Sequence, residues 1–168
     1  MDLGISGLFA LFGVFVGGGI QYILLEQKYL ADAIDKVRDR QVLFGACVAQ
    51  YLQFIRDIQY AEEKNKKKGE IVPLSPDQRA DLSARHRAVV SSTYALMVCD
   101  DVEIASTSAS FLNVFESYVD KHREITTGDQ GEYEPQDGVK DSATDVLGRK
   151  VTLTWPGRRR TGGASQSK

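Results

Sequence analysis

The most pronounced hydrophobic pattern in the chain is an uncharged, mostly apolar run from Leu3 to Leu25. As an α-helix this run would be about 34 Å long at ~1.5 Å per residue, enough to cross a bilayer core of roughly 30 Å. Buried helices of globular domains rarely run this long without a charge, and no basic residue precedes the run, as one would in a signal peptide. The pattern therefore predicts a transmembrane anchor over residues 1–25.

Basic residues gather on one side of this predicted anchor. Lys28, Lys36, Arg38 and Arg40 follow it, whereas only Asp2 and the α-amino group precede it. Cytoplasmic flanks of membrane helices carry an excess of lysine and arginine. The expectation is a single-pass protein of the inner (plasma) membrane, in contact with the lipid bilayer, with its C-terminal domain in the cytoplasm.

Small and polar residues form one stripe within the run. They recur at steps of three and four residues, at Ser6, Ala10, Gly13, Gly17 and Gln21. Such a stripe lets two membrane helices approach closely, and the Gln21 amide offers a hydrogen bond across the contact. Glycine is also common in membrane helices that have no packing role, so both interpretations stay open.

Beyond the run, apolar positions continue at alternating steps of four and three residues. They are Leu30, Ile34, Val37, Gln41, Phe44, Val48, Tyr51, Ile55 and Ile58, with one polar member. This is the heptad spacing of a coiled coil, and further apolar residues widen the stripe from about residue 43. The narrow part predicts a helical stalk over residues 26–40 that pairs with a second copy, as a homodimer or small homo-oligomer. The expected interface residues are Leu30, Ile34, Val37 and Gln41. The alternative is that the C-terminal tail or another protein covers this row of heptad positions, Leu30 to Ile58, which we call the seam.

The lysine-rich stretch at residues 64–68, followed by Gly69, marks the end of the first helix. A second helix has a specific start signal, because Ser75-Pro76-Asp77-Gln78 combines an N-cap, a proline at N1 and a capping-box glutamine at N3. This helix is expected to reach about Val98.

A third helix is expected to begin at Asp100 and to end near Glu124, after a tight break from the second. The fold class is therefore all-α, with a three-helix antiparallel bundle over residues 41–124. From residue 125 to 168 the composition shifts to polar residues and glycine, which predicts a largely disordered or loosely attached tail. Alternation over residues 150–155 indicates one short strand there, and Arg158–Arg160 form a basic cluster of unknown role.

Composition narrows the function. The formal net charge of −2 argues against general nucleic-acid binding, which needs a broad excess of lysine and arginine. The two cysteines, Cys47 and Cys99, stand in separate apolar runs and do not form a disulfide framework. With His86 and His122 they match no zinc spacing, so no metal site is expected. No catalytic residues and no cofactor-binding residues are expected either.

Three segments carry a resemblance to a known group. They are LADAIDKVRDR, VLFGACVAQYLQFIRDIQ and ALMVCDDVEIASTSASFLNVFESYV, the last with Val102 and Ala105 at a V-x-x-A helix start. The chain up to about residue 124 resembles small single-pass, helical-hairpin membrane proteins of unknown function from high-GC bacteria and their phages. The stalk also resembles the peripheral-stalk b subunit of ATP synthase, but the prolines at 73 and 76 depart from that pattern.

The expected function is a membrane-tethered, non-enzymatic interaction or scaffold module that acts as a homo-oligomer, with an unidentified protein partner as a further possibility. The alternative is a phage lysis protein of the inner-membrane spanin kind, with a periplasmic coiled coil. Topology separates the two, because only the spanin places its coiled coil outside the cytoplasm.

Overall fold

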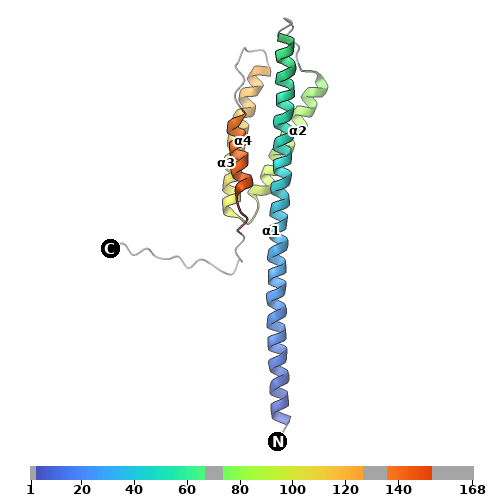
Figure 1. Ribbon diagram of the computed structural model, residues 1–168, viewed down its shortest axis with the longest axis vertical. Helices are drawn as coiled ribbons and strands as arrows, with labels where there is room; N and C mark the ends of the chain where they lie inside the picture. The colour runs from blue at the N-terminus through green and yellow to red at the C-terminus, as the bar shows by residue number, and fades with distance from the viewer. Residues whose placement is uncertain (1–2, 67–73, 127–135, 153–168) are drawn as a thin grey trace, which may run out of the picture. The chain divides into compact units, whose positions relative to one another are not determined.

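The computed structural model describes residues 3–66, 74–126 and 136–152, with side chains described for 21–65, 74–121 and 136–152. These residues are helical almost throughout, and the predicted all-α class is confirmed. The helices are α1 (Leu3–Lys66), α2 (Pro76–Met97), α3 (Val102–Thr126) and α4 (Asp137–Gly148) (Figure 1). Residues Val37–Val151 form one compact unit, called the bundle from here on, and the part of α1 up to Lys36 belongs to a second unit.

The predicted start of α2 is confirmed in detail. The Gln78 backbone N–H donates to Ser75 Oγ at 3.2 Å, and the Ser75 N–H donates to Gln78 Oε1 at 2.9 Å. The two bonds form a capping box, with Pro76 at the first helical position. They satisfy backbone donors that the first turn of a helix leaves without a partner. The four-residue signal in the sequence was therefore enough to place this helix end.

The predicted break between α2 and α3 is also present. The buried carboxylate of Asp101 accepts hydrogen bonds from the N–H groups of Glu103 and Ile104, both at 3.1 Å, and so caps α3. A carboxylate at this position also interacts favourably with the helix dipole. The cap is Asp101, one residue later than the predicted start at Asp100.

Helix α4 lies where the sequence predicted a loosely attached tail, and that prediction is wrong for these residues. Val139, Ala143 and Val146 on α4 are buried, at the four-and-three spacing of one helix face. The bundle accordingly has four helices in the described residues instead of the predicted three, and its boundary lies beyond residue 124. Residues 150–152 do not form the predicted strand, and residues 153–155 of it lie outside the described residues.

Contacts between residues distant in sequence fix the direction of α2 relative to α1. Arg40 Nη1 donates to the carbonyl of Ala95 at 3.0 Å, and Arg85 Nη1 donates to the carbonyl of Gln50 at 3.4 Å. Higher numbers on α1 therefore face lower numbers on α2. The two helices are antiparallel, as predicted.

Ring contacts and amide bonds place the other two helices. Phe44 of α1 lies against Phe111 of α3, and Tyr51 lies against Phe115, so α3 runs parallel to α1. Gln41 bonds to the end of α4, and Gln136, just before its start, bonds to the carbonyl of Leu52, so α4 runs antiparallel to α1. The result is an up-down-up-down four-helix bundle, with its helices side by side in Figure 1.

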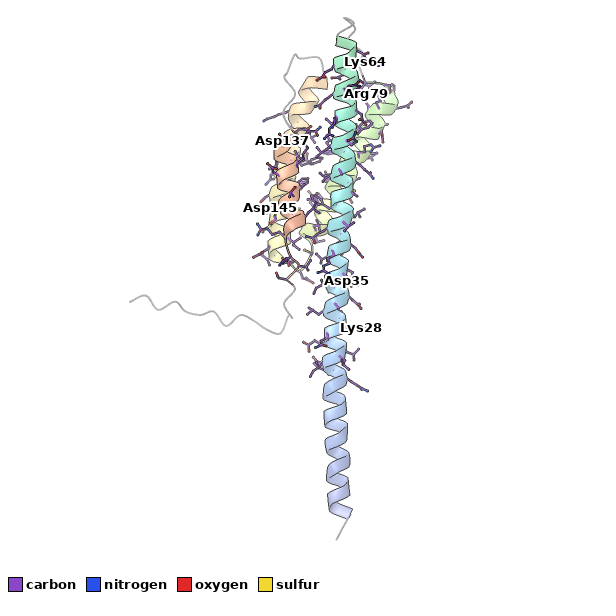
Figure 2. The ribbon with its side chains drawn as sticks, viewed as in Figure 1. Lys28, Asp35, Lys64, Arg79, Asp137 and Asp145 are labelled. Carbon is purple, nitrogen blue, oxygen red and sulfur yellow. The ribbon has the colours of Figure 1, made fainter. Side chains whose placement is uncertain are left out.

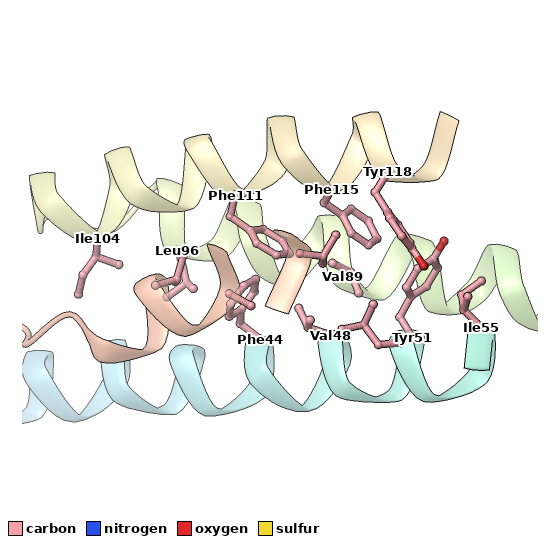
Figure 3. Packing of buried hydrophobic residues seen from close by; sticks show 14 of the residues in the cluster. Phe44, Val48, Tyr51, Ile55, Val89, Leu96, Ile104, Phe111, Phe115 and Tyr118 are labelled. Carbon is pink, nitrogen blue, oxygen red and sulfur yellow. The ribbon is translucent and has the colours of Figure 1, made fainter. Parts of the chain in front are cut away.

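The core of the bundle is formed mainly by the heptad positions of α1 and the facing positions of α3. Its largest fully buried side chains are aromatic, and Figure 3 shows them interleaved between the helices. Phe44 and Phe111 meet edge to face at 4.8 Å between ring centroids, a preferred geometry for aromatic pairs. Charged residues of the bundle labelled in Figure 2, namely Lys64, Arg79, Asp137 and Asp145, are all exposed.

The membrane prediction requires a correction. In the part of the chain that the structure describes, no helix is long and apolar enough to span a membrane. From Gln21, where side chains are first described, the apolar character ends within a few residues, because charged residues recur from Glu26 onwards. The predicted localisation as a single-pass inner-membrane protein is therefore wrong. The predicted continuation of the first helix past residue 25 is present, since α1 is one helix from Leu3 to Lys66.

Candidate functional site

The segment of α1 that precedes the bundle exposes a group of large apolar side chains. Large apolar side chains there are more than half exposed: Tyr22 63%, Ile23 54%, Leu24 59%, Leu25 67% and Tyr29 69%. Four of them are consecutive, and successive residues of an α-helix point about 100° apart. Apolar surface is therefore exposed around the whole helix at these residues, and exposed apolar patches of this kind mark interaction sites. We call Tyr22–Ile34 the exposed segment.

Residues of the predicted stripe of small side chains lie mostly outside the description. The backbone at Ser6, Ala10, Gly13 and Gly17 is helical, but their side chains are not among those described. Gln21, the last member, is exposed. The packing prediction for this stripe stays a prediction.

The four predicted stalk-interface residues fall into two pairs. Leu30 and Ile34 are half-buried residues of the exposed segment, whereas Val37 and Gln41 are only 6% and 7% exposed within the bundle. Gln41 contacts the end of α4, which the sequence analysis did not foresee, and Val37 belongs to the apolar cluster of the bundle. The alternative in which the C-terminal part of the chain covers the seam therefore holds for Gln41.

Gln41 joins α1 to the end of α4. Its Nε2 donates to the carbonyl of Val146 at 3.0 Å and to that of Arg149 at 3.2 Å. At the other end of α4, Gln136 Nε2 donates to the carbonyl of Leu52 at 3.3 Å. Between them, a Cβ added at Gly45 would lie 3.3 Å from Leu147, so the two helices approach closely there. We call the two glutamines the amide pair.

A group of titratable side chains lies around Tyr51, at the end of the core away from Gln41. His86 stacks on Phe115 at 5.5 Å between ring centroids, and its Nε2 is 3.7 Å from Glu116 Oε1. Burial raises the pKa of Tyr51 well above its usual range, and the nearby Tyr118 and Glu116 add to the rise. The ends of Tyr51 and Tyr118 lie close together in Figure 3. This arrangement keeps Tyr51 protonated and packs α1, α2 and α3 together.

A pocket of about 260 Å³ opens between α1 and α2. It is lined by Cys47, Gln50, Asp81, Ala84, Arg85 and Ala88. The Arg85 guanidinium, its most polar group, is already engaged: Nε donates to Asp81 Oδ2 at 3.2 Å, and the group lies 4.8 Å from the centre of the Phe54 ring. The thiol of Cys47 is free and half-buried. The polar groups of the pocket therefore serve the α1–α2 contact.

Metal binding can be examined for the described residues only. They contain no cluster of three or more histidine, cysteine, aspartate or glutamate side chains that could hold an ion. His86 packs on Phe115, and the side chain of His122 lies outside the description.

The amide pair and α4 are the features that sequence reasoning missed. A signal for α4 existed in the spacing of Val139, Ala143 and Val146, but polar residues and two glycines surround it. For Gln41 the seam pattern predicted an interface position but did not identify α4 as the element to which its amide bonds. Comparison with protein families, with curated proteins and with solved structures finds no match to this chain.

Proposed function

We propose that this chain is a non-enzymatic interaction module that associates with a second copy of itself through the exposed segment of α1. The observation that carries the proposal is the exposure of Tyr22–Leu25 on a helix whose later half is packed into a bundle. Fully burying a large apolar side chain stabilises by roughly 1.5–3 kcal/mol as an upper bound. Several such residues together supply a substantial driving force for association.

The spacing of the seam supports a second copy as the partner. When Val48 and Ile55 are assigned to heptad position a, Ile34 is also at a and Leu30 is at d. A β-branched residue at a with leucine at d favours parallel two-stranded coiled coils. Leu30 and Ile34 are half-buried, so part of their surface is available for such a contact.

The non-enzymatic part of the proposal rests on what the exposed segment offers. Its large exposed apolar and aromatic side chains offer contact area. The titratable group around Tyr51 and the residues of the Arg85 pocket hold the bundle together. The spanin alternative depends on a membrane anchor and is not supported by the described residues.

Disulfide crosslinking of the full chain tests the proposal. In a background with Cys47→Ala and Cys99→Ala, an Ile34→Cys variant should form a crosslinked dimer on mild oxidation in cells. Asp32→Cys is the matched control, because Asp32 lies at heptad position f on the far side of the same helix. Absence of the Ile34→Cys dimer, or equal crosslinking at both positions, would contradict the proposal.

A further inference from the structure

The heptad seam of α1 is continuous in sequence but is covered in only part of its length. Val37 and Gln41 follow Leu30 and Ile34 at the same alternating spacing. Val37 and Gln41 are buried in the bundle, while Leu30 and Ile34 are half-buried in the exposed segment. The two pairs therefore share the heptad spacing and differ in how far they are buried.

The cover over Gln41 is the end of α4. Gln41 Nε2 donates to carbonyls at Val146 and Arg149, and Val37, one turn earlier on the same face, belongs to the same apolar cluster as Val146 and Val151. If α4 moved away, Val37 and Gln41 would be uncovered together, and the seam would extend without a break from Leu30.

The buried face of helix α4 is short. Its buried side chains are Val139, Ala143 and Val146, all of them small. No side chain caps its first turn, and glycines stand at its second and last positions, where they lower helix propensity. A helix of twelve residues has little stability of its own in water. Helix α4 is therefore stable only when it packs against the rest of the bundle. Segments of this kind unfold locally most readily.

Gln41 has two alternative partners of the same chemistry. In the bundle its amide donates to backbone carbonyls, which any helix end offers. In a parallel pair of α1 helices Gln41 stands at heptad position a, where polar amides pair across the interface and fix the register. A glutamine amide both donates and accepts hydrogen bonds, so two copies of Gln41 satisfy each other.

We propose that α4 is a releasable strap, and that its release lengthens the contact between two copies of α1 from Leu30 and Ile34 to include Val37 and Gln41. This inference rests on the self-association proposed above. The occupant of the uncovered seam is a second copy, because the seam's heptad spacing matches itself and runs on without interruption from the residues of the proposed interface.

The test compares crosslinking at Ile34 and Val37, first with α4 packed on the bundle and then with α4 displaced from it. The double variant Val139→Asp, Val146→Asp places two charges on the buried face of α4. These charges should displace α4 from the bundle in the full chain. In the background without native cysteines, Val37→Cys should stay monomeric with native α4 and should crosslink as fully as Ile34→Cys with α4 displaced. Thr144→Asp, on the exposed face of α4, is the matched control and should leave Val37→Cys monomeric.

The outcomes separate the two proposals. Crosslinking at Ile34→Cys without any gain at Val37→Cys would overturn the strap while leaving self-association standing. Failure at both positions would overturn both. Amide hydrogen exchange of the unmodified chain gives a measurement that needs no substitution: α4 amides should exchange faster than those around Phe111 in α3. Equal exchange rates in α3 and α4 would show that α4 opens only with the whole bundle, and the strap would be wrong.

Discussion

Two parts of one helix carry the same heptad spacing and meet different surroundings. In the bundle, the seam of α1 from Val37 to Ile58 is buried by α2, α3 and α4. In the exposed segment, the seam positions Leu30 and Ile34 are half-buried, and most of the large apolar neighbours are exposed. The comparison teaches that spacing predicts which face of a helix will be covered, but the covering element has to be found elsewhere in the chain or in another copy.

The largest expected effect contrasts two aromatic side chains, one in each part. Phe44 is fully buried against Phe111, so Phe44→Ala should lower the free energy of unfolding by about 3–5 kcal/mol. Tyr29 is 69% exposed, and Tyr29→Ala should change it by less than about 0.5 kcal/mol. Urea unfolding followed by circular dichroism measures both. Similar losses for the two variants would mean that Tyr29 is packed in the folded chain.

The next effect is the pH dependence of the free energy of unfolding, and it arises from a residue of the bundle. The pKa of Tyr51 is raised in the folded state because burial disfavours the phenolate, so unfolded chains lose this proton first. Stability from this group is fully present below the ordinary tyrosine pKa of about 10 and falls above it, by at most about 1.4 kcal/mol per pH unit. Unfolding of the wild type and of Tyr51→Phe between pH 8 and 11 measures the difference. Curves that stay parallel over this range would show that Tyr51 does not contribute.

A third effect tests the cap at the start of α3, one of the helices that cover the seam of α1. Asp101 caps α3 with two hydrogen bonds, so Asp101→Ala should lower the free energy of unfolding by about 1 kcal/mol, within a range of roughly 0.5–2. Asp100→Ala is the matched control, because Asp100 is exposed beside it. An equal loss at Asp100 would assign the effect to charge near the helix start instead of to the cap.

The smallest effect concerns an imperfection in the core. The Ser108 hydroxyl is fully buried and has no hydrogen-bond partner among the described residues. Ser108→Ala removes that polar group and adds helix propensity, so it should raise the unfolding free energy by about 0.5–1 kcal/mol. Ser106→Ala, at an exposed position that bonds to the Glu103 carbonyl, serves for comparison. Destabilisation by Ser108→Ala would reveal that the hydroxyl has a partner.

The elements that local signals specify could be predicted from the sequence. The capping box at Ser75 and Gln78 fixed the start of α2 because both side chains bond to backbone within the same turn. The seam from Phe44 to Ile58 was predicted as a buried face because its spacing follows the helical repeat.

Features that depend on distant residues could not be predicted in the same way. Helix α4 has only three small apolar positions, and its stability comes from its seat on the rest of the bundle, which no local pattern encodes. For the same reason Gln41 was assigned to an interface with a second copy, whereas in the structure its amide bonds to the end of α4. The membrane prediction relied on the apolar run from Leu3 to Leu25 and is not supported by the helices that the structure describes.

The central claim is that the exposed segment of α1 joins two copies of this chain. Sedimentation of the purified full chain tests it most directly, beside an Ile34→Asp variant with unchanged helical content. The wild type should sediment at twice the 18.6 kDa mass of one chain, and Ile34→Asp should sediment as the monomer. A wild type that remains monomeric across the concentration range, or a dimer that Ile34→Asp leaves intact, would contradict the account.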